Sequence, residues 1–204
     1  MPAIASFPKQ QELNRDAGAA LLDRIGPAIL LTHSQSGAFG WPIADARPRL
    51  VKAIAAVEPS GPPVHDAAFK GAPDWFGDGP LSKPWGLTAV PLSYDGIKSA
   101  EELRFEEQQK PDAPNLIRCW GQQQPARQLS NLRNIPVAIF TSEASYHASY
   151  DHCTAQYLAQ AGVKNSFIRL ADRGIRGNGH MMMLEKNNLE IARVIAEWIG
   201  QTVH

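Results

Sequence analysis

Residues 28–37, which read AILLTHSQSG, decide the fold of this 204-residue chain. The first five residues are almost entirely apolar, as is typical of a short strand buried on both faces of a parallel sheet. The strand leads directly into small residues, and the sequence after Ser34 predicts a helix ending near Arg47 and Pro48. Pro42 is expected within the first turn or two of that helix, where proline is tolerated.

The rest of the chain mostly alternates between helical and strand patterns. Helices are predicted over residues 10–26, 150–162 and 188–199, and strands over residues 53–57, 136–141 and 165–170. Alternating strands and helices are typical of an α/β fold with a mostly parallel sheet and right-handed crossovers. We therefore expect one α/β domain over residues 1–204, with helices flanking the sheet.

The middle of the chain differs from this regular pattern. Between Pro59 and Pro136 lie 11 of the 16 prolines and three of the five tryptophans, and one short helix is predicted near residues 99–108. We interpret residues 61–134 as a cap-like insertion within the domain, and a surface insertion with no role at a site is the equal alternative. The aromatic residues expected to cover a site there are Trp75, Phe76, Trp85, Tyr94 and Trp120.

Ser34 lies at the turn between a strand and a helix, which is the layout of a nucleophile elbow. The usual elbow pattern is G-x-S-x-G, and here Thr32 and Ser36 take the two glycine positions. A serine nucleophile needs a histidine base and a carboxylate that orients the base. His180 follows the strand at 165–170, in a glycine-rich loop. Serine capping of the helix is the structural alternative for Ser34.

Two carboxylates compete for the acid position. Glu58 ends the strand at 53–57, and Glu143 follows the strand at 136–141, so both lie at the carboxyl edge of the predicted sheet. We favour Glu58, because its strand ends abruptly at Pro59. Either choice gives the chain order serine, acid, histidine, which is the order found in α/β-hydrolases.

With these residues, the chain resembles the C-terminal part of an α/β-hydrolase from the bacterial esterase-like branch. The segments that carry the resemblance are residues 32–37, 57–60 and 177–188. It implies a serine hydrolase that acts on small-molecule carboxylic esters through an acyl-enzyme, without a cofactor or a metal. In that branch the acid occupies the position of Glu58. The resemblance also implies that the backbone N–H of Gln35 contributes to the oxyanion hole.

The resemblance implies that the early strands of the family are missing, together with the loop that donates the second oxyanion N–H. We therefore expect an N-terminally truncated domain in which residues 28–32 form an unprotected edge strand. Either the chain is a piece of a longer protein, which we favour, or the short form is genuine and pairs this edge with a second copy of the chain. Because one oxyanion donor would be absent, the rival hypothesis is a ligand-binding protein that has lost turnover.

Composition excludes other classes of function. The 20 basic and 20 acidic residues balance, so nucleic acid and anionic membranes are not expected as partners. The apolar stretches are too short to span a bilayer. The cytoplasm is the default location, although a full-length form could carry a signal peptide and be secreted.

Two further groups of residues were weighed and set aside. Cys119 and Cys153 are predicted to be buried free thiols rather than one disulfide. The second group is His147, Asp151, His152 and Cys153. A metal site there is not favoured, because their spacing does not place three ligands on one helix face. His33 is assigned to packing at the elbow.

Overall fold

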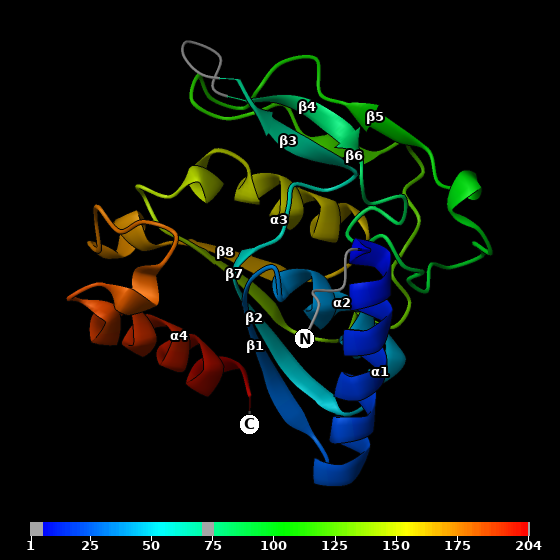
Figure 1. Ribbon diagram of the computed structural model, residues 1–204, viewed down its shortest axis with the longest axis horizontal. Helices are drawn as coiled ribbons and strands as arrows, with labels where there is room; N and C mark the ends of the chain where they lie inside the picture. Colours follow the sequence, from blue (N-terminus) through cyan, green and yellow to red (C-terminus); the bar gives the residue numbers. More distant parts are fainter. Residues whose placement is uncertain (1–5, 71–75, 204) are drawn as a thin grey trace.

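The computed structural model describes residues 6–70 and 76–203. Its centre is a four-stranded parallel sheet in the order β1-β2-β7-β8 (Figure 1). The strands are β1 (Ala28–Ser34), β2 (Val51–Pro59), β7 (Val137–Thr141) and β8 (Asn165–Arg169). Each predicted strand is present, and the parallel sheet is confirmed.

Helices cover both faces of this sheet. They are α1 (Phe7–Ile25), α2 (Gly37–Ala46), α3 (Asp151–Gln160) and α4 (Asn188–Thr202). The first three lie on one face, with α1 packed on α2, and α4 lies on the other. Alternate residues of β2 therefore serve two cores: Ile54 and Ala56 face the first three helices, whereas Ala55 and Val57 face α4.

Pro42 lies inside α2, in its second turn, as the sequence predicts. Because proline has no N–H, the carbonyl oxygen of Ala38 lacks its helical donor. The fully buried side chain of Gln11 supplies one, with its Nε2 3.0 Å from that oxygen. The Oε1 of the same side chain accepts the N–H groups of Ala89 and Val90. The side chain of Gln11 on α1 thus replaces the donor that α2 lacks and also hydrogen-bonds the insertion.

The insertion contains two small antiparallel pairs beyond the carboxyl ends of the sheet strands (Figure 1). These are β3 (His65–Phe69) with β4 (Phe76–Leu81), and β5 (Phe105–Glu107) with β6 (Trp120–Gln122). The prediction of a helix near residues 99–108 is wrong. Only one 3-10 turn forms, Ala100–Glu102, because the following residues pair with β6, a contact that local periodicity does not encode.

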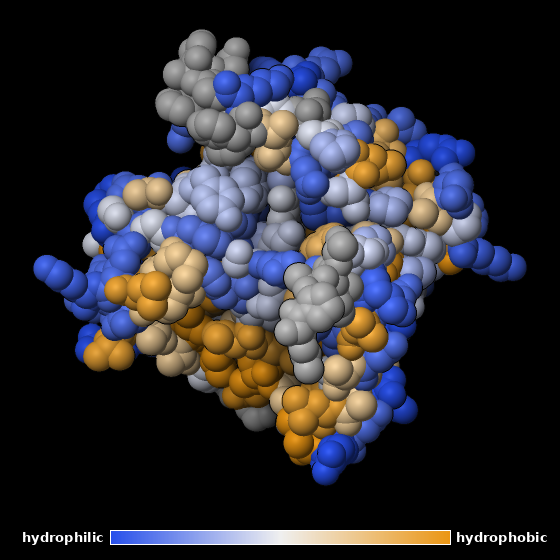
Figure 2. All heavy atoms as spheres, viewed as in Figure 1, coloured by the Kyte–Doolittle hydropathy of each residue, from blue (hydrophilic) through white to orange (hydrophobic). Residues whose placement is uncertain are grey.

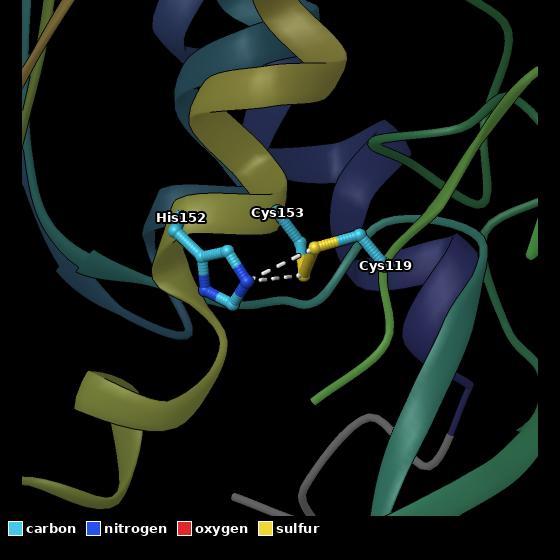
Figure 3. Close-up of side chains that lie close together, drawn as sticks. All are labelled: Cys119, His152 and Cys153. Atoms are coloured by element: carbon cyan, nitrogen blue, oxygen red, sulfur yellow. Dashed lines mark hydrogen bonds between the residues drawn. A yellow bond between two sulfur atoms is a disulfide. The ribbon is translucent and has the colours of Figure 1, made fainter. Parts of the chain in front are cut away.

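A disulfide joins the insertion to α3 (Figure 3). The interpretation of Cys119 and Cys153 as free thiols is therefore wrong. They are 34 residues apart in the sequence, yet their Cα atoms are 5.1 Å apart. The fold places the segment before β6 against the first turn of α3, a proximity that cysteine spacing alone does not reveal.

β1 is an edge strand that pairs only with β2 among the described residues. Leu31 on this strand is 61% exposed. Figure 2 shows apolar residues gathered over the area where Figure 1 draws β1 and α4. The prediction of an apolar, unprotected edge is confirmed for the described residues. Within the same residues, no helix has the length and apolar character needed to cross a bilayer.

Candidate active site

Ser34 is the last residue of β1 and has a left-handed backbone, with φ of 56°. The sharp turn brings α2 very close to the strands. A Cβ at Gly37 would lie 2.5 Å from the Cα of Pro59, and one at Gly40 would lie 3.1 Å from the Cγ2 of Thr32. The close approach that the elbow pattern assigns to flanking glycines is therefore provided here by two glycines on the helix.

Ser36, which takes the second glycine position of the elbow pattern, closes the turn with its side chain. Its Oγ donates to the carbonyl oxygen of His33 at 2.7 Å and accepts the N–H of the same residue at 2.8 Å. The departure from the glycine pattern thus adds two hydrogen bonds across the nucleophile position. Ser34 is not the N-cap of α2, since Ser36 holds that place.

Glu58 reaches the site through an irregularity in the pairing of β1 with β2. His33 pairs with Val57 and Ser34 with Pro59, so Glu58 is skipped. It has φ of 42° and a fully buried side chain. Such bulges redirect a side chain that would otherwise follow the pleat.

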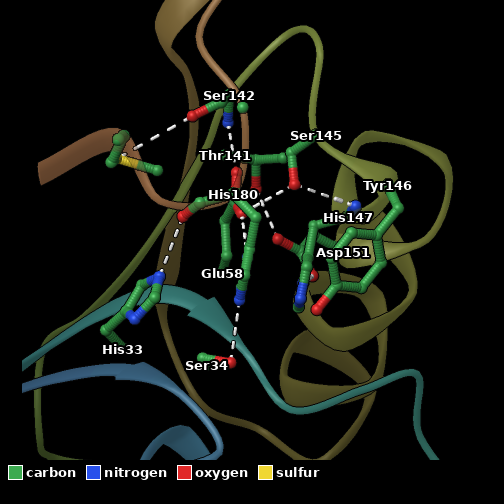
Figure 4. Close-up of polar contacts among 12 residues, drawn as sticks. His33, Ser34, Glu58, Thr141, Ser142, Ser145, Tyr146, His147, Asp151 and His180 are labelled. Atoms are coloured by element: carbon green, nitrogen blue, oxygen red, sulfur yellow. Dashed lines mark hydrogen bonds and ion pairs between the residues drawn. The ribbon is translucent and has the colours of Figure 1, made fainter. Parts of the chain in front are cut away.

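Ser34, His180 and Glu58 form one continuous line of hydrogen bonds (Figure 4). The Nε2 of His180 is 2.8 Å from the Oγ of Ser34, and its Nδ1 is 2.6 Å from the Oε2 of Glu58. The buried carboxylate has two more donors. The N–H of Ser142 lies 2.8 Å from Oε1, and the hydroxyl of Ser145 lies 2.7 Å from Oε2.

Glu143, the alternative acid, has no contact with the histidine ring among the described residues. Its carboxylate binds Arg176 at 2.8 Å and the N–H of Gly177 at 3.0 Å. These contacts hold the loop that leads to His180. The structure therefore brings Glu58 to the histidine and leaves Glu143 at the surface.

Gln35 and His33 flank the serine. The backbone N–H of Gln35 has no hydrogen-bond partner among the described residues, so it is open to an incoming oxygen atom. His33 does more than pack: its Nε2 lies 2.9 Å from the carbonyl oxygen of His180, and the two rings are 4.6 Å apart. The residue before the serine thus holds the histidine loop in place.

A second buried pair, which the sequence interpretation did not connect with the triad, lies beside His180. The Nδ1 of His147 is 2.8 Å from the Oδ1 of Asp151, whose Oδ2 accepts the hydroxyl of Thr141 at 2.7 Å. Burial lowers the pKa of His147 to about 4 and raises the pKa of Asp151 well above its usual value. The i,i+4 spacing of this pair is the sequence signal that could have revealed it.

The residues considered for a metal separate into two groups in the structure. His152 and Cys153 lie at the disulfide, where the Nε2 of His152 is 3.2 Å from the sulfur of Cys119, so neither cysteine offers a thiolate (Figure 3). His147 lies near Glu58 and His180, but the two imidazole rings are parallel. Nitrogen lone pairs lie in the ring planes, so those of parallel rings do not converge on one ion.

The aromatic residues of the insertion mostly pack inward. The hydroxyl of Tyr94 donates to the carbonyl oxygen of Trp85 and lies 2.9 Å from the hydroxyl of Tyr157, which places it in the main core. Trp120 stacks on His65. Trp75 lies outside the described residues, as does the side chain of Phe76.

The chain is similar in sequence and in fold to known proteins. No protein-family model matches the chain. A probable secreted lipase, phiG, of Fungal sp. strain ATCC 74256 is 45% identical over 197 residues. The match covers 96% of this chain and 52% of that protein, so the chain spans about half the length of this curated relative.

Solved structures give the fold. A novel bacterial esterase matches with a TM-score of 0.53 and 22% identity, over 91% of this chain and 42% of that one. A monoacylglycerol lipase of Paleococcus ferrophilus matches with a TM-score of 0.50 and 15% identity, over 97% and 76%. The chain has an α/β-hydrolase fold. In this α/β-hydrolase fold, Ser34 is the last residue of the edge strand β1, and the fold expected from the sequence is confirmed.

Proposed function

We propose that this chain carries the catalytic centre of a serine hydrolase that cleaves carboxylic esters. The hydrogen-bonded line from Ser34 through His180 to Glu58 carries the proposal, with distances of 2.8 and 2.6 Å. Its chain order and its position at the carboxyl ends of adjacent parallel strands fit the α/β-hydrolase arrangement. The lipase and esterase among similar proteins support the same reaction class.

In the proposed mechanism, the Oγ of Ser34 attacks the ester carbonyl carbon while the Nε2 of His180 takes the hydroxyl proton. Glu58 stabilises the imidazolium through Nδ1, and the N–H of Gln35 donates to the oxyanion. The intermediate collapses and the alcohol leaves with the proton from Nε2. Water then attacks the acyl-serine, gives a proton to His180, and releases the acid with Ser34 restored.

We also propose that the protein works in an oxidising compartment. The disulfide between Cys119 and Cys153 supports this location, because reducing cytosol keeps thiols free. The name of the fungal relative, a probable secreted lipase, points in the same direction. This proposal replaces the cytoplasmic default taken from the sequence.

The proposal is tested by treating the chain and its Ser34→Ala variant with a fluorophosphonate and measuring intact mass. We expect one adduct on the wild type and none on the variant. Hydrolysis of a short nitrophenyl ester should fall about a million-fold in the variant.

A folded wild type that gains no adduct would contradict the proposal. If such a protein bound an ester analogue equally well with and without Ser34, the rival ligand-binding function would explain the result. Circular dichroism of both proteins serves as the control for folding.

A further inference from the structure

The segment between β7 and α3 wraps around the catalytic histidine. It contains Ser145, the 3-10 turn η2 (Tyr146–Ser149) and the first residue of α3. Within it, the ring of His147 lies parallel to the ring of His180, with an interplanar angle of 0° and centroids 4.7 Å apart. Figure 4 shows His33 and His147 on either side of His180.

We propose that His147 is a positioning residue for catalysis: its ring, anchored by Asp151, holds the ring plane of His180 in line with Ser34 and Glu58. This inference rests on the proposed hydrolase function and assigns a task to a buried pair that the triad itself does not use. His147 acts through His180 and has no role in bonding to the substrate.

His147 is anchored through both its ring and its backbone. Its side chain is 2% exposed, and that of Asp151 is fully buried. The Nδ1 of His147 is bound to Asp151, which Thr141 fixes in turn. The backbone N–H of His147 donates to the Oγ of Ser145 at 3.2 Å. A ring held this firmly offers a fixed plane against which another ring can be oriented.

One turn supports both catalytic partners. The Oγ of Ser145 donates to Glu58, and two residues later the ring of His147 packs against His180. The carboxylate and the imidazole, which come from distant parts of the chain, are therefore aligned by one short segment. A misplacement of about 1 Å at such a site costs roughly a hundredfold in rate.

The charge of His147 fits this task. Burial lowers the pKa of His147 to about 4, so the ring is neutral near pH 7. A neutral ring can lie against an imidazolium without electrostatic repulsion. The other titratable groups around the two rings include Glu58, Asp151, His33, Tyr146 and Tyr150.

The test compares rings with non-rings at position 147. His147→Phe and His147→Leu are each made together with Asp151→Asn, since neither apolar side chain can pair with a buried carboxylate. Both double variants lose the same hydrogen bond, and they differ only in the ring. We expect the Leu variant to lose about tenfold to a hundredfold in kcat, with KM within about twofold, whereas the Phe variant keeps kcat within about threefold of wild type.

Two single variants complete the set. His147→Gln keeps a donor for Asp151 and lacks the ring, so it should lose kcat as the Leu variant does. His152→Gln is the matched control: this histidine is also buried, but it lies on α3 and contacts the disulfide. It should lower the melting temperature and leave kcat within about twofold of wild type. Equal kcat for the Phe and Leu variants would overturn the proposal.

A measurement that needs no turnover separates this inference from the proposed function. The proton between the Nδ1 of His180 and Glu58 gives a low-field signal in proton NMR. We expect the signal to persist in wild type and the Phe variant, and to broaden by faster exchange in the Leu and Gln variants. If wild type failed to hydrolyse esters but showed this pattern, the proposed function would fall and the positioning role would stand. An unchanged signal in all variants would overturn the positioning role.

Discussion

The sheet and the insertion over residues 61–134 are held together by different kinds of interaction. The sheet consists of strands whose consecutive apolar residues fill two cores, with helices on both faces. In its described residues, the insertion has two short strand pairs, one 3-10 turn and a disulfide to α3. The residues of the proposed triad all lie on the sheet strands or on the turns that follow them.

The difference between the two regions predicts which substitutions change the rate of the reaction and which change the stability of the fold. At the sheet edge, side chains such as Glu58 are aimed at one another by strand ends and bulges, so a substitution there should change rate more than stability. In the insertion, long-range links such as Cys119–Cys153 replace regular structure, so breaking one should change stability more than rate. Four experiments test this division, in order of expected effect.

The largest effect is expected at the proposed acid. Glu58→Gln should lower kcat about a thousandfold to ten-thousandfold, because the amide cannot stabilise an imidazolium and favours the wrong tautomer of His180. Glu143→Gln is the matched control and should stay within about threefold, since its partners are Arg176 and Gly177. Steady-state ester hydrolysis measures both. A larger loss in the control would remove Glu58 from the proposed triad.

The second effect concerns the cross-link to the insertion. Replacing Cys119 and Cys153 with alanine should lower the free energy of unfolding by about 3 to 4 kcal/mol, the amount expected for a loop of this length. Urea denaturation measures the change. Well below the melting temperature, kcat should stay within about threefold of wild type. A large loss of kcat in a fully folded variant would show that the insertion takes part in chemistry.

The third effect is the pH dependence of stability at His152. Burial lowers the pKa of His152 below its usual 6.5, so the unfolded state binds more protons than the folded state in mildly acidic solution. The free energy of unfolding should therefore fall as the pH drops below about 6.5. His152→Gln should reduce this slope in denaturation curves taken at several pH values. An identical slope in both proteins would contradict the assigned direction.

The smallest effect on folding is expected at the edge strand. We propose that β1 pairs with a second copy of the chain, because its outer edge has no strand partner among the described residues. Leu31→Lys places a charge on this edge and should change the free energy of unfolding by less than about 0.5 kcal/mol. It should nevertheless reduce self-association in sedimentation experiments. A wild type that is monomeric at high concentration would contradict the pairing.

The strands of the sheet were predictable because each one is marked by the pattern of consecutive residues in the sequence. The apolar run before Ser34 and the abrupt end of a strand at Glu58 are both visible in the sequence, and the structure brings the two residues together with His180. The insertion was not predictable in the same way. The pairing of β5 with β6 and the disulfide depend on contacts between distant segments, which periodicity does not record.

Within the site, the same limit applies to the residues around the triad. His147 and Asp151 entered the sequence prediction only as a disfavoured metal group, because nothing in their spacing says that the parallel ring of His180 lies beside them. Ser145 gave no signal at all, although its hydroxyl reaches Glu58. The ends of the strands could be located from the apolar pattern of the sequence, whereas the residues that contact a loop could be identified only from the folded structure.

The backbone at the site carries a consequence for directed evolution. Ser34 and Glu58 both have positive φ values, a conformation that costs a residue other than glycine about 1 to 3 kcal/mol. Glycine at either position would relieve that strain and abolish the proposed chemistry. A library screened for heat resistance alone would therefore enrich inactive proteins, so any stabilisation campaign on this scaffold must screen for turnover at every round.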